Sequence, residues 1–534
     1  MEISKMKKIL TFIIFTLPIF CSALDLKYTP VQHGGRVKPF DTLASESMRL
    51  IYGKTNYEGK EPSILVLTWI LAPQVWSKTE FIQIKNRELK KTLGLETNKD
   101  FFSQENLANN PSIESLLQNL QVKLKKEIKL NAFDQALSRL QGQLLRLNGF
   151  QSGSILKFAP QKDEGSAWLS VNEFDSDYQK KFSSVLKVLT SSINSSDKQA
   201  LNEASKDLNE LIYANYLGDT EALKAKIKAE VLYNNFHPFR YAWIAYLFSL
   251  FFIFFFWLWD KKIFLNGFKA FMVLGFLLHL FGFALRVYIS GRPPVSNMYE
   301  TVLWVPFGTI LFGFIVGKMN KSILPYVGSA VVALFCLIIS DLAPVILDPS
   351  IQPLEAVLRS NFWLMVHVLT ITISYSAFFL AFILGDFSMF YHLNENKYRL
   401  QIQNITQSIY RSLQIGILLL AVGTVLGGVW ADYSWGRFWG WDPKETWAFI
   451  ALMGYLALFH ARLVGWVKGF GMAAGAILSF SLVIMAWYGV NFWLGAGLHS
   501  YGFGSGGVEY VSIFVLIHIV LVLYVGFYRK LKNS

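Results

Sequence analysis

The pattern of apolar and polar residues changes near residue 238. Between residues 25 and 237, apolar residues recur at intervals of three and four among many charged ones, for example within 113–147 and 197–231. This period is typical of amphipathic helices in water. From residue 241 onward the chain carries apolar runs close to the ~20 residues that a membrane-spanning helix needs. The runs are 241–259, 268–289, 299–317, 322–340, 362–391, 412–430, 445–464, 470–488 and 511–528.

This pattern predicts an all-α polytopic membrane protein with about nine transmembrane helices, preceded by a mostly α extracytoplasmic domain. We place the domains at 24–238 and 239–534. The stretch 30–39 is rich in turn-forming residues, and 151–170 combines glycine and proline with alternating apolar residues, which indicates a short hairpin. No catalytic constellation is visible in the first domain, and its role stays open.

Residues 1–23 have the order of an export signal. Three lysines precede an apolar stretch from Ile9 to Phe20, and the small residues Ser22 and Ala23 follow it. The apolar stretch is shorter than a spanning helix, so a cleaved signal peptide and an uncleaved N-terminal anchor both remain open. Either reading places the first domain outside the cytoplasm.

Composition supports the membrane assignment. Hydrophobic residues make up 53% of the 534 residues and charged residues only 16%, whereas soluble chains carry about 25% charged residues. The net charge is +13, but no basic stripe with interleaved aromatic residues is present, so nucleic acid is not an expected partner.

Basic residues mark every second connection between the spans as cytoplasmic. Such residues follow the first, third, fifth, seventh and ninth spans: Lys261, Lys262, Lys318, Lys321, Lys397, Arg399, Arg411, Arg462, Lys468, Arg529, Lys530 and Lys532. The connections 290–298, 341–361, 431–445 and 489–510 then face outward, in agreement with an exported first domain. We expect a bacterial inner-membrane protein with its first domain on the periplasmic side.

The outward connection before the seventh span has an unusual composition. Residues 430–447 contain five tryptophans, with glycines and a run Asp-Pro-Lys-Glu beside them. One or two tryptophans at this depth are typical of an interfacial aromatic belt. Five indoles beside a polar rim favour instead a platform for a large planar ligand. The residues that we single out are Trp430, Trp435, Gly436, Arg437, Trp439, Trp441, Asp442, Pro443, Glu445 and Trp447.

Two histidines belong to the same membrane face as this loop. His367 lies about five residues into the fifth span, roughly 8 Å from its outer end, and His499 lies in the last outward connection. Ionisable residues within membrane segments are functional candidates, and an imidazole pair is a common way to hold haem iron. We therefore expect His367 and His499 to be iron ligands.

A third histidine, His460, lies thirteen residues beyond Trp447 on one predicted helix, roughly 20 Å deeper. It cannot share an iron with the outer pair and indicates a second site near the cytoplasmic side. His279 is a weaker candidate, while His33, His237 and His392 are expected to be structural. The two cysteines, Cys21 and Cys336, form no Cys-x-x-Cys motif, so any thiol chemistry needs other proteins.

Three stretches of the chain resemble the CcsA (ResC) family of cytochrome c biogenesis proteins. The loop 430–447 resembles the family's WWD signature, 291–300 its Pro-x-Ser-Asn-x-Tyr-Glu stretch, and 497–502 its second external histidine motif. The resemblance covers about residues 241–530, while 30–44 resembles more weakly an extra domain fused ahead of CcsA in some bacteria.

The resemblance implies a component of a System II holocytochrome c synthase of the haem lyase type, with no catalytic residue of its own. It assigns His367 and His499 to the outer haem site and His460 to the inner site. It implies haem b as the transported substrate, apocytochrome c with Cys-x-x-Cys-His as acceptor, a separate CcsB (ResB) partner, and thiol-reducing proteins. Arg292 or Arg437 would pair with the haem carboxylates. Two alternatives stay open: a haem exporter or delivery protein of the CcmC or CcmF branch, and a membrane scaffold.

Overall fold

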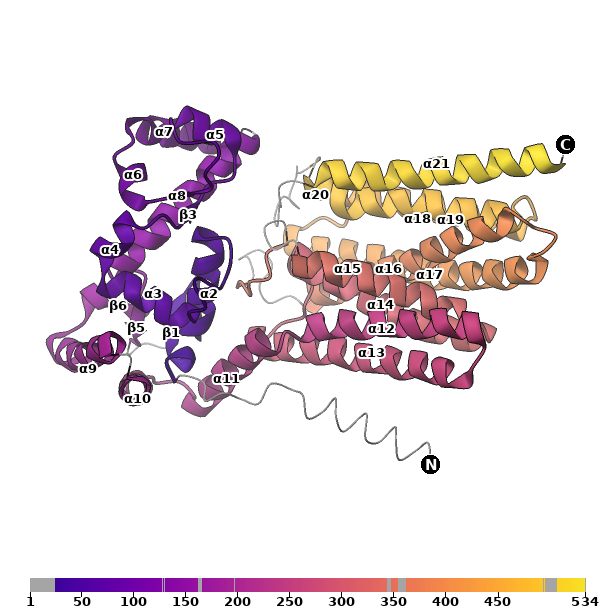
Figure 1. The fold of residues 1–534 in the computed structure, drawn as a ribbon. Coiled ribbons are helices and arrows are strands. Elements are labelled where there is room, and N and C mark those ends of the chain that lie inside the picture. Colours follow the sequence, from indigo (N-terminus) through magenta and orange to yellow (C-terminus); the bar gives the residue numbers. More distant parts are fainter. Residues whose placement is uncertain are drawn as a thin grey trace, which may run out of the picture. The chain divides into compact units, whose positions relative to one another are not determined.

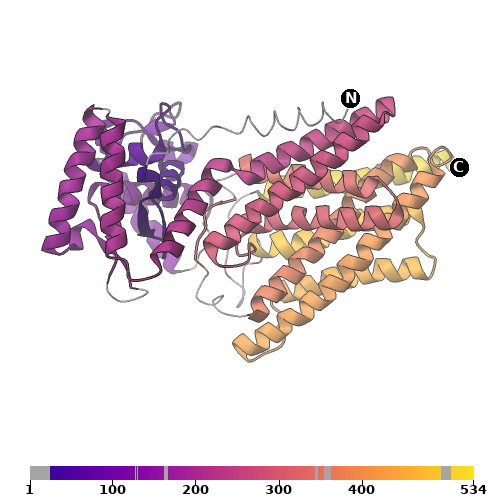
Figure 2. The ribbon, with the colours of Figure 1, turned by 90° about the horizontal axis from the view of Figure 1, so that it is seen from below.

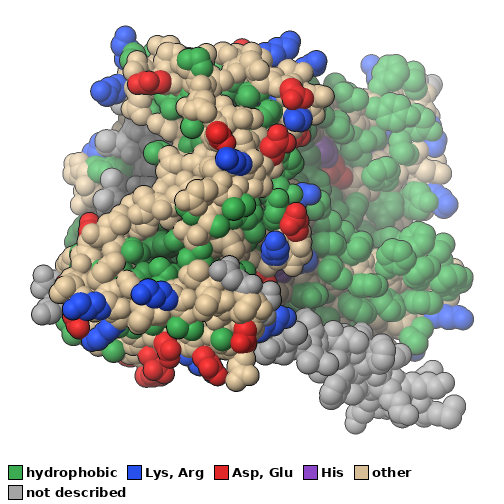
Figure 3. Space-filling view, turned by 60° about the vertical axis from the view of Figure 1, so that its left-hand side comes forward, with side chains coloured by type: hydrophobic (Ala, Val, Ile, Leu, Met, Phe, Trp, Pro, Cys, Tyr) green, Lys and Arg blue, Asp and Glu red, His purple; other side chains and the backbone are tan. Residues whose placement is uncertain are grey.

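The computed structural model describes residues 25–126, 128, 130–161, 166–195, 197–342, 347–353, 362–492, 494 and 507–533. The predicted signal segment 1–23 and His499 lie outside these residues. The chain divides into two compact units, Met1–Asn235 and Phe236–Ser534. Figure 3 shows side chains of both charges spread over the first unit, while the visible surface of the second is covered by hydrophobic side chains.

The first unit opens with a β-hairpin, because Gly34 and Gly35 both take positive φ between β1 (Pro30–His33) and β2 (Arg36–Pro39). Such a two-residue turn matches the twist of the strands that it joins. The hairpin pairs Pro30 with Pro39, and its sheet has the order β2-β1-β5-β6. The hairpin predicted within 151–170 is present as β5 (Lys157–Ala159) and β6 (Leu169–Ser170). A second small sheet pairs β3 (Ile82–Gln83) with β4 (Phe101–Phe102).

Helices surround these sheets (Figure 1). The segment 113–147 forms two helices rather than one, because the side chain of Asn131 caps a new start in a capping box with Asp134. Helices α9 and α10 lie side by side, as Figure 2 shows. The helices are α2 (Phe40–Ile51), α3 (Pro62–Leu71), α4 (Pro73–Lys78), α5 (Arg87–Thr92), α6 (Gln104–Ala108), α7 (Pro111–Lys125), α8 (Ala132–Gln151), α9 (Ser176–Ser195), α10 (Lys198–Ala214) and α11 (Thr220–Phe236), with 3-10 turns at Asp25–Tyr28 and Val171–Glu173.

The second unit is a bundle of long helices that run side by side (Figure 1). Within the described residues, nine helices are long and apolar enough to cross a membrane, which confirms the predicted all-α polytopic fold. They are α12 (Pro238–Trp259, continuous with α11 in this count), α13 (Lys262–Ser290), α14 (Met298–Asn320), α15 (Leu324–Leu342), α16 (Phe362–His392), α17 (Arg399–Trp435), α18 (Pro443–Leu463), α19 (Gly469–Ile484), which continues through a π-turn into α20 (Val490–Phe492), and α21 (Val508–Asn533).

Helix α16 lies at the centre of the bundle. Of its most apolar window, 61% is buried inside the protein, against 11% for α21, and it packs closely against α17 and α19. Helix α17 begins at Arg399, well before the predicted apolar run at 412, and has 37 residues. At 1.5 Å per residue it is about 55 Å long, so its polar first turns extend beyond a hydrocarbon core of about 30 Å.

Candidate functional site

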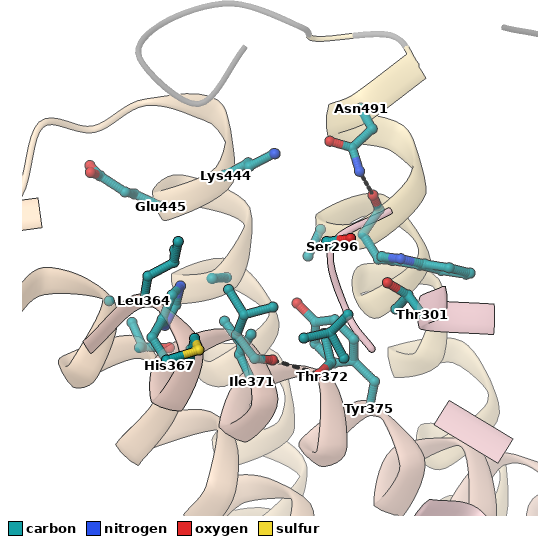
Figure 4. A pocket seen from close by; sticks show the side chains of 18 of the residues that line it. Ser296, Thr301, Leu364, His367, Ile371, Thr372, Tyr375, Lys444, Glu445 and Asn491 are labelled. Carbon is teal, nitrogen blue, oxygen red and sulfur yellow. Dashed lines mark hydrogen bonds between the residues drawn. The ribbon is translucent and has the colours of Figure 1, made fainter. Parts of the chain in front are cut away.

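A cavity of about 240 Å³ opens at the end of the bundle where α16 begins and α17 ends. Figure 4 shows side chains from several helices converging on it. Its wall is mainly apolar, with a small number of polar and charged groups, which is the usual make-up of a small-molecule site. The lining includes Arg292, Ser296, Thr301, Leu364, His367, Ile371, Thr372, Tyr375, Trp439, Lys444, Glu445, Ala448, Trp487 and Asn491.

The predicted ligand His367 lies in this wall. Its Nδ1 is 2.7 Å from the carbonyl oxygen of Gly423 on α17. A neutral imidazole that donates Nδ1–H to a carbonyl carries its lone pair on Nε2, the arrangement common in metal-binding histidines. The ring also packs on Gly427, where a Cβ atom would lie 2.6 Å from the Cε1 atom of His367. The position of the His367 imidazole thus depends on Gly423 and Gly427 of α17.

Two of the five tryptophans are packing residues of the helix end. Trp430 is 1% exposed and forms a small core with Leu364 and Ala431. Trp435 meets it edge to face, with ring centroids 4.6 Å apart. Neither belongs to the cavity lining. Their packing holds the end of α17 against the start of α16, next to His367.

A network of charges shapes the loop that follows. Gly436 ends α17 with φ +68, and Arg437 then donates to the Oε1 atom of Glu445 at 3.0 Å and lies 3.7 Å from the carboxylate of Asp442. The Oε2 atom of Glu445 accepts the backbone N–H of Gly440 at 2.7 Å. Asp442 caps α18 in a capping box with Glu445, and Pro443 takes the first helical position. Arg437, Asp442 and Glu445 are therefore partners of one another.

The remaining tryptophans take three different places. Trp439 lines the cavity, and its ring meets that of Trp441 edge to face at 5.7 Å. Trp441 is 67% exposed and has φ +57. Trp447 is half-buried in the first turn of α18 and is not among the lining residues. Trp439 is thus the indole of the loop that faces the cavity within the described part of the chain.

The segment 291–300 forms a buried ionic cluster beside the cavity. Glu300, fully buried, accepts from Arg286 at 2.9 Å and from Arg292 at 3.0 Å. Asn297 caps α14 by accepting the backbone N–H of Glu300. Arg292 also donates to the carbonyl oxygen of Gln352 at 2.8 Å, so it joins the connection between α15 and α16 to the cavity wall.

His460, which is predicted for a second site, and the weaker candidate His279 are not part of this cavity lining. His460 is exposed in the last turn of α18, with its Nδ1 2.8 Å from the carbonyl oxygen of Leu456, and is absent from the cavity lining. His279 is fully buried, 3.1 Å from the carbonyl oxygen of Leu303, among the rings of Phe239, Phe283 and Phe307. These contacts are those of a packed core histidine.

Two ionisable residues, Lys444 and His518, are not among those predicted from the sequence. Lys444 lies inside the tryptophan-rich stretch and lines the cavity, yet only its aromatic and acidic neighbours are singled out from the sequence. His518 on α21 lies 3.4 Å from Asp386 on α16, between the rings of Phe382 and Phe514. The rule that marks ionisable residues in apolar spans, applied to 511–528, identifies His518 as well.

Comparisons of the sequence find cytochrome c assembly and biogenesis proteins among those similar to this chain. The family described as Cytochrome C assembly protein matches residues 295–499. Protein NrfI of Wolinella succinogenes is 29% identical over 503 residues, covering 88% of this chain and 53% of NrfI, so the chain spans about half of that relative's length. Cytochrome c biogenesis protein CcsA of Prochlorococcus marinus is 34% identical over 281 residues, covering 45% of this chain and 87% of CcsA. The solved structure of cytochrome c haem lyase CcmF covers 54% of this chain and 50% of its own at 17% identity, with a TM-score of 0.38.

Proposed function

Because this chain belongs to the CcsA family of cytochrome c biogenesis proteins, we propose that it binds haem b, carries it to the outer face of the membrane and positions it for attachment to apocytochrome c. In this role it is a component of a holocytochrome c synthase. A CcsB (ResB) protein is its partner, and the inner bacterial membrane its location.

The observation that carries this proposal is the setting of His367. The histidine lies in the wall of a mainly apolar cavity, with its Nδ1 committed to the carbonyl oxygen of Gly423 at 2.7 Å. This hydrogen bond orients the ring, and Nε2 is the iron-ligating atom in this proposal. An apolar cavity with one oriented imidazole suits a planar iron macrocycle better than a metal ion alone. Within the described residues, no cluster of three or more His, Cys, Asp or Glu side chains provides a metal site.

The loop 430–447 gives this site its rigidity. Trp430 and Trp435 pack the end of α17, and the ion pair of Arg437 with Glu445 fixes the turn into α18. Trp439 then offers an indole on the cavity wall. Stacking on such a ring stabilises a flat aromatic ligand by about 1 kcal/mol beyond the area that it buries.

The attachment step needs no nucleophile from this chain. Each thiol of Cys-x-x-Cys-His adds its S–H bond across one vinyl group of haem, so a C–S and a C–H bond form and no oxidant or leaving group is required. This chain holds the substrate in place and orients it, which is how positioning accelerates a reaction between two bound partners. The thiols come from apocytochrome c, kept reduced by other proteins.

Two further ligands complete the proposal. His499 is the second axial ligand of the outer site, and His460 is the ligand of an inner site toward the cytoplasm. His460 is exposed at the far end of α18, about 20 Å beyond Trp447, so a ligand from CcsB has access to it. The second candidate function, haem export without attachment as in the CcmC or CcmF branch, needs the same cavity but no apocytochrome.

Co-expression with CcsB and an exported Cys-x-x-Cys-His reporter tests the proposal. We expect the purified membrane complex to show a haem absorbance spectrum and the reporter to carry covalent haem. His367→Ala, His499→Ala and His460→Ala should each reduce reporter haem, while His279→Ala reports on packing alone. Covalent haem retained in all three variants would contradict the ligand assignment. Bound haem without any covalent product would favour the exporter.

A further inference from the structure

An ionisable pair lies deep in the second unit, away from the cavity of His367. Asp386 on α16 is 8% exposed, and its Oδ2 atom is 3.4 Å from Nε2 of His518 on α21. Asp386 follows His367 by nineteen residues on the same helix, about 28 Å at 1.5 Å per residue. Neither member of the pair lines that cavity, so the candidate site does not account for it. Ionisable side chains within membrane spans are costly and are functional candidates.

The surroundings of this pair are almost entirely apolar. The imidazole of His518 contacts the rings of Phe382 and Phe514, with centroids 4.8 and 4.4 Å away. A cavity of about 110 Å³ beside it is lined by apolar side chains of α16, α19 and α21, together with Ser481 and His518. Such surroundings replace little of the stabilisation that water gives to a charge, so a charged form depends on partners close by.

Within the described residues, no third charged group forms an ion pair with Asp386 or His518. Helix α19 contains no Asp, Glu, His, Lys or Arg. On α16 and α21 the nearest titratable side chains in sequence are Tyr391 and Tyr524, five and six residues away. At the end of the bundle where α16 ends, the other helices packed against α16 carry Lys318, Tyr326, Arg399, Tyr410 and Arg411. None of these side chains makes a hydrogen bond or ring contact with either member of the pair.

The hydrogen bonds of the pair favour a protonated carboxyl group. Nδ1 of His518 is 2.7 Å from the carbonyl oxygen of Phe514, so this nitrogen carries a hydrogen. In a neutral imidazole Nε2 is then an acceptor, and it lies next to Oδ2 of Asp386. The other oxygen, Oδ1, is buried and has no donor among the described residues. A buried carboxylate needs donors at both oxygens, whereas in a carboxylic acid Oδ1 is an uncharged carbonyl oxygen.

We propose that Asp386 and His518 form a proton-binding site, in which the Asp386 carboxyl carries the proton at neutral pH and donates it in a hydrogen bond to Nε2 of His518. The pair is then uncharged, as its apolar surroundings require. The site also joins α21 to the bundle, where only 11% of the most apolar window of α21 is buried and α16 and α19 are its neighbours. Loss of the proton would leave a carboxylate without a donor beside α21, so the packing of this helix depends on the proton. The inference involves no haem and stands independently of the proposed function.

Infrared spectroscopy of the purified full chain at pH 7 tests the protonation state. The C=O stretching band of a carboxylic acid is separate from the bands of carboxylates and of amides. We expect the spectrum of the wild type minus that of Asp386→Asn to contain one such band. Asp260→Asn is the matched control and should give no such band, because Asp260 is exposed at the end of α12. A difference spectrum of Asp386→Asn without the band overturns the proposal.

Hydrogen exchange of the α21 amides distinguishes a neutral acid from an ion pair. In Asp386→Asn the side-chain amide donates to Nε2 of His518 as the protonated acid does, so exchange should stay within about twofold of that in the wild type. In an ion pair the same variant would leave a buried imidazolium unpaired, and exchange would become at least about tenfold faster. Such faster exchange contradicts the proposal.

A second variant covers the case in which Asp386→Asn does not fold. Asp386→Glu keeps the acid, and the protein is produced with carbon-13 in its aspartate carboxyl groups and with unlabelled glutamate. The C=O band of the acid at residue 386 should then move from the labelled position in the wild type to the unlabelled position in the variant. A band that stays at the labelled position shows that it comes from another aspartate and overturns the proposal.

Discussion

The position of His367 is set by residues that have no side chain. At Gly427 a Cβ atom would lie 2.6 Å from Cε1 and 2.9 Å from Nδ1 of the imidazole, and at Gly423 it would lie 3.0 Å from the backbone of Ile371. Glycine at these two positions lets α16 and α17 approach closely enough for the Gly423 carbonyl to reach His367. The position of this proposed iron ligand therefore depends on both helices.

Gly427→Ala is expected to displace the ring of His367 and weaken the proposed haem site. The added methyl group overlaps the ring, and overpacking of this kind costs about 1–3 kcal/mol. A loss of about 2 kcal/mol at the ligand corresponds to roughly thirtyfold weaker haem binding. An absorbance titration measures the affinity, and a shifted spectrum reports the altered ligation. Gly142→Ala on α8 is the control, because a Cβ there meets nothing within 4 Å. Unchanged haem binding in Gly427→Ala would refute this account of the site.

His33 makes the first unit sensitive to acid. Burial, followed by the nearby charges of Arg146 and Lys38, lowers its pKa from 6.5 to about 3. In the unfolded chain His33 binds a proton near pH 6.5, whereas in the folded chain it stays neutral until the pH falls to about 3. The contribution of neutral His33 to the free energy of unfolding is therefore complete above pH 6.5. This contribution is lost as the pH falls toward 3.

We expect His33→Gln to flatten this dependence. Glutamine stays neutral in both states, so the melting temperature of the variant should fall less than that of the wild type between pH 7 and pH 4, by a few degrees. Scanning fluorimetry at a series of pH values measures the two curves. The carboxylates of the chain contribute equally to both, so the difference between the curves isolates His33. Parallel curves would show that His33 does not titrate in this way.

At the scale of elements, α11 is joined to the hairpin that opens the first unit. Glu230 on α11 is 3% exposed and accepts from both terminal nitrogens of Arg36 at 2.7 Å. The hydroxyl of Thr42 donates to the same carboxylate at 2.9 Å, and Asn234 donates to Thr42. A buried carboxylate with a bidentate arginine is strongly destabilised when one partner is removed.

Glu230→Gln should loosen α11 from the hairpin. Removing the charge leaves Arg36 without its carboxylate and costs about 3 kcal/mol. Hydrogen exchange of the amides of α11 in the full-length protein should then accelerate by roughly a hundredfold. Glu221→Gln on the same helix is the control, since that side chain is 83% exposed and pairs with Lys224 on the surface. Equal protection of α11 in both variants would show that the pair contributes little.

The sequence predicts these elements unevenly, for physical reasons. Apolar runs identify the membrane helices well, because every span must be apolar over about 20 residues whatever its neighbours are. They miss the first turns of α17, where polar residues leave the hydrocarbon. The motifs locate His367 beside the tryptophan-rich loop. They do not predict that Arg437 pairs with Glu445 or that Lys444 lines the cavity. The partners of charged side chains depend on tertiary packing, which a motif does not specify.

The whole molecule combines two units, and its relatives match different shares of the chain. The CcsA relative matches 45% of the chain, whereas NrfI matches 88%. Since Phe236–Ser534 makes up little more than half of the chain, the match to NrfI extends through most of the first unit. The first unit carries many charged side chains and the second carries helices apolar enough to cross a membrane, so the orientation of these helices decides on which side of the membrane the first unit lies.

The distribution of basic residues predicts that orientation. Lysine and arginine near the ends of spans stay on the cytoplasmic side, which places the connection between α18 and α19 inside and the end of α17 outside.

Tyr433 near the end of α17 is 77% exposed, and Trp466 between α18 and α19 is 85% exposed. In a chain with both native cysteines replaced by serine, a membrane-impermeant maleimide should label Tyr433→Cys in intact cells and Trp466→Cys only after permeabilisation. The opposite pattern would place the cavity on the cytoplasmic face and exclude attachment of haem to an exported apocytochrome there. Labelling of both positions in intact cells would show leaky membranes, so a cytosolic marker protein with one exposed cysteine is included to verify that they are sealed.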